Sequence, residues 1–302
     1  MHRYAAVRHH YEIVAMKMHY APSLATLMVG AIALAASWFV PSTPAQAQES
    51  PDASSCSVPP ALIRVDQPLL RTATRLGRRP FRIVAIGSSS TEGAGASGPE
   101  ASYPAVLARE LSQRFPNASI AVFNKGVGGE RIDATIARFE KDVVALNPDV
   151  VVWQVGTNDA TANDAIDHFE ASLLAGIQQL RVKGKDLILM SPQFSPRMNV
   201  RSNQLLYIET IRSAAQRYGI QLFRRFDIMN FWVASGQLNV PDLIIGDGLH
   251  MTDLGYYCTA VLLADMLETA AKAGESVMGS PHTPLVPPAR PGANTGVTSG
   301  AR

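Results

Sequence analysis

The stretch VVVWQVGTND, residues 150–159, decides the fold of this chain of 302 residues. Its first part, Val150–Val155, is apolar without alternating polar positions, which is typical of a parallel strand covered on both faces. The strand runs into the turn-forming residues Gly156-Thr157-Asn158-Asp159. The stretch therefore predicts a central strand of a parallel sheet, with a polar loop at its carboxyl end.

Strand-like and helix-like segments alternate on both sides of this stretch. Such alternation predicts an α/β fold with a doubly wound, mostly parallel, five-stranded sheet. The other strands are predicted at 81–86, 119–124, 186–190 and 220–223. The helices are predicted at 102–115, 132–145, 166–181, 202–218 and 253–271, the last capped by Thr252.

Polar or glycine-rich loops follow the first three predicted strands: Ser88–Ser90, Gly126–Gly129 and Gly156–Asp159. In open α/β sheets, ligands bind at the carboxyl ends of the strands. We therefore expect these loops to converge on one crevice, which the loop Asp247–His250 can close.

Three histidines remain after residue 47, namely His168, His250 and His282. Only His250 follows a carboxylate by three residues in a glycine-containing loop. That spacing lets Asp247 bind one imidazole nitrogen and leaves the other for proton transfer, as serine chemistry requires. The alternative is that Asp247 only caps the following helix.

Ser89 is the candidate nucleophile, His250 its base and Asp247 the residue that orients the base. Attack on an ester carbonyl places negative charge on oxygen, which needs preorganised donors. The candidate donors are the backbone N–H groups of Ser89 and Gly129 and the side-chain amide of Asn158. Taken singly, each loop could be an ordinary turn, and Ser88 or Ser90 could replace Ser89 as nucleophile.

Other chemistries find no support in the sequence. The glycines after residue 86 do not match G-x-G-x-x-G, and the phosphate-binding G-K-[ST] is absent. Two cysteines and three histidines make no metal framework, and no basic patch points to nucleic acid. We therefore expect no cofactor and no metal.

Taken together and in this order, the loops resemble the blocks of the SGNH (GDSL-type) hydrolase superfamily. The matching stretches are 86–90, 124–130, 156–159 and 247–250, and the resemblance spans roughly residues 81–271. It implies a three-layer α/β/α fold and a metal-free ester hydrolase. Ser89, Asp247 and His250 would form the triad, and Gly129 and Asn158 would complete the oxyanion hole.

The chain departs from that pattern in its first block. The usual Gly-Asp-Ser-Leu is here Gly87-Ser88-Ser89-Ser90, so serines replace both the Asp and the Leu. Since the Asp is not a triad member, its loss leaves the mechanism standing. It puts the hydrogen bonding of the loop and the catalytic rate in question.

The N-terminal part of the chain reads as a secretory leader. Basic residues precede an apolar stretch of 17 residues, Leu24–Val40, and Ala45-Gln46-Ala47 is a cleavage signal. Translation could start at Met16 or Met18, and an uncleaved anchor is the competing interpretation. We predict a leader over 1–47, a linker or N-terminal extension over 48–75, a hydrolase domain over 76–274, and a disordered Pro/Gly-rich tail over 275–302.

The predicted mature protein is periplasmic or secreted and carries no net charge, because the leader removes three basic residues and one acidic one. In an oxidising compartment Cys56 and Cys258 could pair, and the alternative is two buried thiols. No stable membrane insertion is expected after cleavage. The sequence does not predict an oligomeric state.

The leading functional hypothesis is an exported serine esterase, with short O-acyl groups on carbohydrate as its substrate. A lysophospholipase or thioesterase acting on lipid is a second hypothesis, for which Phe194, Met198, Phe231 and Trp232 could line an apolar trough. Acyl transfer to a sugar is a third. The fourth, from a different class, is a catalytically weakened binding protein on the same fold.

Overall fold

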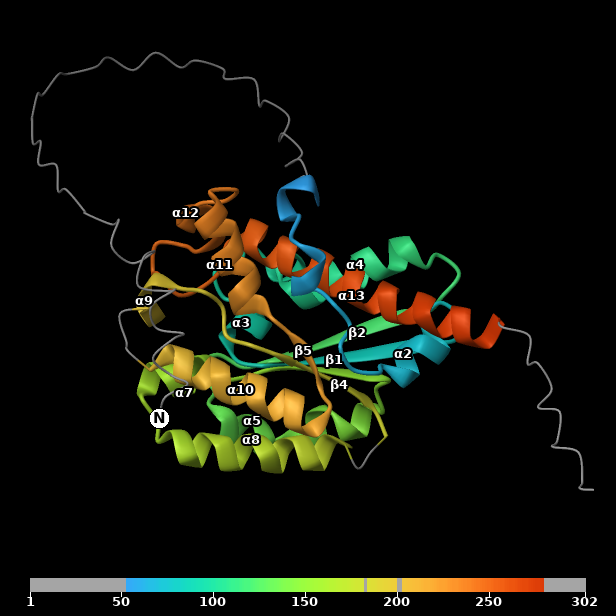
Figure 1. Cartoon of the computed structure of the whole chain (residues 1–302), viewed down its shortest axis with the longest axis horizontal. Helices are drawn as coiled ribbons and strands as arrows, with labels where there is room; N and C mark the ends of the chain where they lie inside the picture. Colours follow the sequence, from blue (N-terminus) through green and yellow to red (C-terminus); the bar gives the residue numbers. More distant parts are fainter. Residues whose placement is uncertain (1–52, 182–183, 200–202, 280–302) are drawn as a thin grey trace, which may run out of the picture.

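The computed structural model describes residues 53–181, 184–199 and 203–279. The predicted leader and nearly all of the predicted tail lie outside these residues. Their backbone forms one five-stranded sheet with helices on both faces (Figure 1). This arrangement confirms the predicted α/β class.

The sheet is parallel throughout, in the order β2-β1-β3-β4-β5. Its strands are β1 (Phe81–Gly87), β2 (Ile120–Gly126), β3 (Val150–Gln154), β4 (Asp186–Met190) and β5 (Gln221–Phe223). Every residue of β3 and β4 is buried, in agreement with their continuous apolar sequences. Because the strand order reverses beside β1, a crevice is expected at the carboxyl ends of β1 and β3.

Apolar side chains from the two faces of the sheet form two separate core clusters. In β1, Ile83 and Ala85 belong to one cluster, and Val84 and Ile86 belong to the other. The first face carries α2 (Leu70–Arg75), α4 (Tyr103–Arg114), α11 (Arg225–Ser235) and α13 (Asp253–Gly279). The second carries α5 (Ile132–Ala137), α6 (Phe139–Asp142), α8 (Ile166–Arg181) and α10 (Gln204–Tyr218), as Figure 1 shows.

Short helices occupy several connections. At strand ends these are α3 (Ser89–Glu92), α7 (Thr157–Ala162) and α9 (Pro196–Asn199), and α12 (Val240–Leu243) precedes the Asp247 loop. The 3-10 helices are η1 (Ala53–Cys56), η2 (Pro60–Leu62), η3 (Pro99–Ala101) and η4 (Val144–Leu146). The helix predicted over 132–145 is instead α5, α6 and η4, because Arg138 leaves helical geometry at φ −107°. Its guanidinium donates to the carbonyls of Gly87 and Lys125.

Secondary structure is also found before residue 76, where the hydrolase domain is predicted to begin. Residues 53–75, predicted to be a linker or N-terminal extension, form η1, η2 and α2 and pack on the first face of the sheet. Cys56 forms a disulfide with Cys258 of α13, and the carboxylate of Asp186 accepts hydrogen bonds from Arg71 and Thr72. At the other end, α13 continues to Gly279, past the predicted start of the tail.

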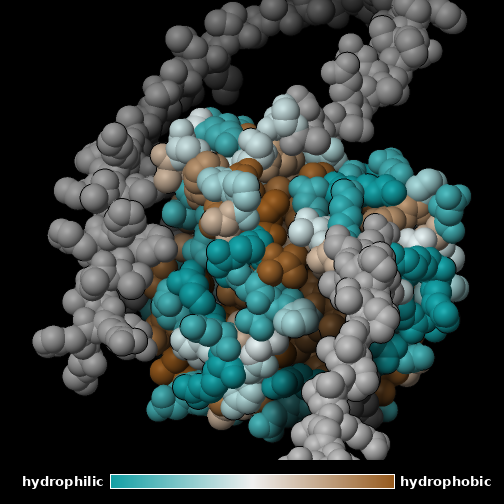
Figure 2. Space-filling view, turned by 45° about the vertical axis from the view of Figure 1, so that its right-hand side comes forward, coloured by the Kyte–Doolittle hydropathy of each residue, from teal (hydrophilic) through white to brown (hydrophobic). Residues whose placement is uncertain are grey.

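The surface of the described body is mixed. On the face that Figure 2 shows, hydrophilic residues are interspersed with hydrophobic ones. Among the described residues, the large hydrophobic side chains that are exposed are Leu70 and Val127. Not one of the described helices combines the length and the apolar character that crossing a membrane requires.

Candidate active site

The turn that carries the candidate nucleophile Ser89 lies where β1 ends and α3 begins. Ser89 is the first residue of α3, and its side chain is largely buried, with the residue 8% exposed. The turn packs tightly against the end of β2, because a Cβ built on Gly126 would lie 1.9 Å from the backbone nitrogen of Glu92. Glycine at position 126 therefore allows the end of β2 to approach the backbone of α3.

A chain of two hydrogen bonds, which we call the relay, connects Ser89 through His250 to Asp247. The Nε2 atom of His250 lies 3.0 Å from the Oγ atom of Ser89. The Nδ1 atom of the same ring lies 2.5 Å from the Oδ2 atom of Asp247. These contacts place the imidazole between a hydroxyl and a carboxylate, which is the arrangement that activates a serine.

The loop that carries Asp247 and His250 holds the carboxylate in place with its own backbone. The Oδ1 atom of Asp247 accepts the N–H groups of Leu249 at 2.8 Å and His250 at 2.9 Å. Gly248 permits the turn by adopting φ +71°. Burial alone would raise the pKa of Asp247, but these bonds and the imidazole outweigh it and lower that pKa. Asp247 therefore stays ionised at neutral pH.

Gly129 and Asn158, the candidate oxyanion residues, lie on two loops that are hydrogen-bonded to each other. The side-chain amide of Asn158 donates one N–H to the carbonyl of Glu130 at 2.8 Å. An amide carries two N–H donors, so this bond leaves one available. The carboxylate of Asp159 accepts the N–H of Ile132 and secures the same loop.

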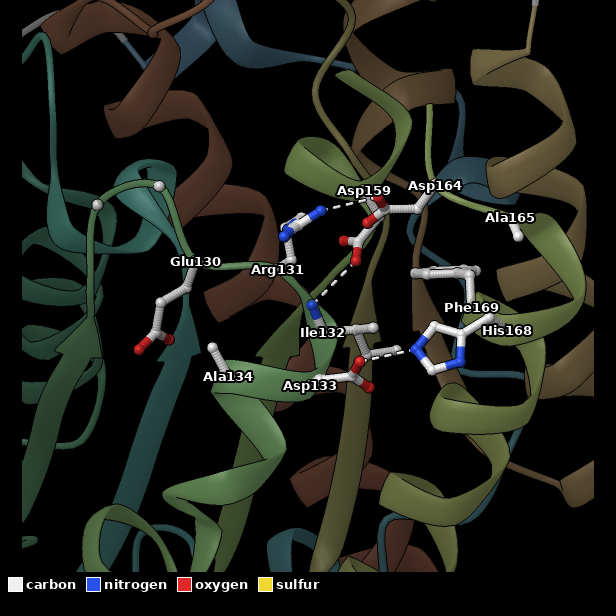
Figure 3. Close-up of a pocket in the computed structure, with 12 residues that line it drawn as sticks. Glu130, Arg131, Ile132, Asp133, Ala134, Asp159, Asp164, Ala165, His168 and Phe169 are labelled. Carbon is white, nitrogen blue, oxygen red and sulfur yellow. Dashed lines mark hydrogen bonds and ion pairs between the residues drawn. The ribbon is translucent and has the colours of Figure 1, made fainter. Parts of the chain in front are cut away.

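A hollow of about 730 Å³ opens beside Gly129, and Figure 3 shows the residues that line it. Two pairs of its polar side chains are bonded to each other, Arg131 with Asp164 at 2.8 Å and His168 with Asp133 at 2.7 Å. His168 therefore lies on the predicted helix but is engaged away from the Ser89–His250 pair. A Cβ added to Gly129 would meet no atom within 4 Å.

Several buried polar residues behind the candidate triad were not predicted from the sequence. The Oε1 atom of Gln154 accepts the N–H and the hydroxyl of Ser88, at 2.8 and 3.1 Å. Ser88, which replaces the Asp of the GDSL pattern, is thus held by a glutamine at the end of β3. One signal was present, since Gln154 is a polar residue within an otherwise apolar strand. Gln193 and Arg225 are also fully buried.

Nothing in the described part of the chain resembles a metal centre. Residues 53–181, 184–199 and 203–279 contain no group of three or more His, Cys, Asp or Glu side chains that could hold a metal ion. The candidate nucleophile, base and carboxylate are already bonded to one another.

The sequence matches the Non-GDSL lipase-like family over residues 55–273. It is also 31% identical over 121 residues to an acetylxylan esterase of Geobacillus stearothermophilus, an alignment that covers 36% of this chain and 55% of the esterase. The chain thus spans about half the length of this curated relative. Because the family is described as non-GDSL, placement in the SGNH (GDSL-type) superfamily stays a prediction.

Two solved structures share the fold. A two-domain esterase active on acetylated mannans, crystallised with mannopentaose, has a TM-score of 0.58 and 22% identity. That alignment covers 68% of this chain and 55% of the esterase. The acetylxylan esterase of Geobacillus stearothermophilus has a TM-score of 0.53 and 22% identity, over 62% of this chain and 94% of the esterase. Catalytic mutants of that enzyme replace a serine or a histidine by alanine.

Proposed function

Because the chain belongs to the Non-GDSL lipase-like family, we propose that it is a serine esterase with Ser89 as nucleophile, His250 as base and Asp247 as the orienting carboxylate. The observation that carries the proposal is the relay from Ser89 Oγ to His250 Nε2 at 3.0 Å and from His250 Nδ1 to Asp247 at 2.5 Å. A serine hydroxyl is a weak nucleophile until such a base removes its proton.

In the proposed reaction, His250 takes the proton of Ser89 as the hydroxyl oxygen attacks the ester carbonyl carbon. The charge on the carbonyl oxygen is stabilised by the N–H groups of Ser89 and Gly129 and by the amide of Asn158. His250 then protonates the departing alcohol, which leaves an acyl group on Ser89. Water, activated by the same imidazole, releases the acid and regenerates the serine.

We propose short O-acyl groups on carbohydrate as the substrate class. The named activities of the acetylxylan and acetylated-mannan esterases support this choice. The packing of the apolar residues disfavours a lipid substrate, because Phe194, Met198 and Trp232 are 4% exposed or less and pack in the core. Of the four residues that the lipid hypothesis named, only Phe231 is half-buried and not fully enclosed. A long acyl chain therefore loses most of the contacts that this hypothesis assigned to it.

We further propose that the protein is exported and acts in the periplasm or outside the cell. The disulfide between Cys56 and Cys258 supports an oxidising compartment. Fractionation of expressing cells tests this point, and the control is a variant in which the apolar stretch Leu24–Val40 of the predicted leader is replaced by polar residues. Recovery of the unaltered protein in the cytoplasm would contradict it.

A fluorophosphonate probe, which reacts with activated serines, tests the catalytic proposal on the purified protein. We expect labelling of the unaltered protein, none in Ser89→Ala and strongly slowed labelling in His250→Ala. His168→Ala is the matched control and keeps the label, because His168 pairs with Asp133. Absence of label from the folded protein would favour a binding protein, and label persisting in Ser89→Ala would place the nucleophile on another serine.

Substrate class is tested by comparing acetyl with dodecanoyl esters of one alcohol. Faster cleavage of the dodecanoyl ester would overturn the carbohydrate proposal in favour of lipid. Adding an acetylated xylooligosaccharide and a free sugar acceptor distinguishes hydrolysis from acyl transfer. We expect free acetate to be the main product and acetylated acceptor to be minor.

A further inference from the structure

Arg225 and Gln193 form a buried polar pair behind the candidate triad. Both residues are 0% exposed, and the Nη2 atom of Arg225 donates to the Oε1 atom of Gln193 at 3.0 Å. The guanidinium also donates to the hydroxyl of Ser90 at 3.3 Å and to the carbonyl of Ser191 at 3.1 Å. The pair thus connects the turn after β1 with the loop after β4.

Three partners of this pair are chain neighbours of candidate catalytic residues. Ser90, which binds Arg225, follows Ser89. Gln193 accepts the hydroxyl of Thr157, which precedes Asn158, at 3.1 Å. Its Nε2 atom donates to the carbonyl of Leu249, which precedes His250, at 3.1 Å. A single buried cluster therefore reaches the nucleophile turn, the oxyanion turn and the histidine loop.

The charge of Arg225 is unusual for so buried a position. Its hydrogen-bond partners in the described part of the chain are hydroxyl, amide and carbonyl groups, with no carboxylate among them. Burial lowers the pKa of Arg225 to about 10, so the guanidinium remains a cation at neutral pH. Burying an unpaired charge destabilises a fold. This cost suggests a role other than stability.

A guanidinium only donates hydrogen bonds. This property determines which group donates and which accepts in each hydrogen bond of the cluster. Since Arg225 donates to Gln193 Oε1, the amide nitrogen of Gln193 must face Leu249. Thr157 donates to the same oxygen, so its own oxygen accepts the Nε2–H of Gln154 at 3.2 Å.

This direction continues to the nucleophile turn. With its nitrogen toward Thr157, Gln154 turns its oxygen toward the N–H and hydroxyl of Ser88, which precedes Ser89. Because the guanidinium of Arg225 cannot accept a hydrogen bond, the side-chain amides of Gln193 and Gln154 are each held in one of their two possible orientations.

We propose that Arg225 and Gln193 are positioning residues, which hold Ser89, Asn158 and His250 in their reactive arrangement through Ser90, Thr157 and Leu249. This inference rests on the proposed esterase function. It also explains the departure at position 90, where the resembled pattern has leucine. An apolar side chain there could not accept the Arg225 hydrogen bonds, whereas Ser90 accepts two.

The test compares steady-state hydrolysis of a soluble acetyl ester by Arg225→Met, Arg225→Lys and the unaltered protein. We expect Arg225→Met to lower kcat about 10- to 100-fold while KM changes less than about twofold, since no contact with substrate is lost. Lysine is also a cation that only donates hydrogen bonds. Arg225→Lys should therefore retain roughly a fifth or more of the kcat that Arg225→Met loses. The neighbouring Arg224→Met is the matched control, because Arg224 pairs with Asp66 and should keep kcat within about twofold.

Ser90→Ala tests the same contact with little risk to folding, because it removes a single oxygen. We expect kcat to fall about 3- to 10-fold, and Arg225→Lys to lower kcat less in the Ser90→Ala background than alone, since both changes act on one contact. Circular dichroism and thermal unfolding establish that each variant is folded. A folded Arg225→Met or Ser90→Ala with unchanged kcat overturns the inference, as does an equal loss in Arg224→Met. An unaltered protein that neither hydrolyses esters nor takes the fluorophosphonate overturns the esterase proposal, and with it this inference.

Discussion

The sulfur atoms of Cys56 and Cys258 are bonded across 202 residues of sequence. The bond joins η1, at the start of the described chain, to α13, which begins three residues after His250. Both cysteines are 0% exposed. The disulfide thus anchors the N-terminal segment to the helix that follows the Asp247–His250 loop.

Reduction of this disulfide is expected to lower the free energy of unfolding by about 2–4 kcal/mol, because the cross-link restricts the unfolded chain. Urea unfolding of Cys56→Ser with Cys258→Ser, compared with the oxidised protein, measures the difference. The esterase rate at low temperature should change less than about twofold, since the bond lies outside the relay. Equal urea midpoints would contradict the prediction.

Local sequence patterns predicted the strands and the Asp247–His250 pair. Contacts between residues far apart in the sequence were harder to predict. Continuous apolar runs identified β3 and β4, and the D-x-x-H spacing placed Asp247 beside His250 because both lie on one turn. Ser89 and His250 are 161 positions apart, and only the order of the loops at strand ends connected them in the prediction. The pairing of the two cysteines could not be decided from the sequence alone.

Helix α11 shows why other parts escaped prediction. Its buried residues Arg225, Ile228, Met229 and Trp232 follow helical spacing on one face. That face includes a charged residue, and the less buried Phe231 and Val233 are apolar, so no amphipathic stripe marks a helix. A charged residue such as Arg225 is normally read as a surface position. Its burial depends on Ser90, Ser191 and Gln193, which no sequence spacing connects to it.

Asp247→Asn is expected to lower kcat on the order of 10³-fold, because asparagine offers His250 Nδ1 no anionic acceptor and so leaves the tautomer unfixed. Asp253→Asn is the control, since Asp253 accepts the N–H of Ser97 outside the relay. Steady-state hydrolysis of an acetyl ester measures both variants. A kcat within about fivefold of the unaltered enzyme in Asp247→Asn would show that Asp247 does not orient the base.

Gly126→Ala is expected to destabilise the protein by more than about 2 kcal/mol, because the added Cβ would lie 1.9 Å from the backbone nitrogen of Glu92. The clash is with backbone, so the nucleophile turn itself must move. Gly246→Ala is the matched control, with no atom within 4 Å of the added Cβ, and should change stability by less than about 0.5 kcal/mol. Thermal unfolding of the two variants provides the comparison, and equal stabilities would refute the close packing of β2 on α3.

Asp66 should contribute stability that acid removes. Burial alone would raise the pKa of Asp66, but hydrogen bonds from Arg224 and Arg64 outweigh burial and lower that pKa below the ordinary 3.8. The ionised form is thus favoured in the fold. Its stabilisation is present above pH 3.8 and is lost as the pH falls through the lower pKa of the folded state.

Asp66→Asn should therefore lower the free energy of unfolding at pH 7 by about 1 kcal/mol. The difference in free energy of unfolding between the variant and the unaltered protein should become smaller as the pH drops below 4. Urea unfolding at pH 7 and pH 3 measures the two differences. Glu140→Gln, at an exposed position of α6, is the control and should show a difference near zero at both pH values. An equal effect of Asp66→Asn at both pH values would mean that the charge of Asp66 contributes nothing, and that only its shape matters for holding the segment before α2.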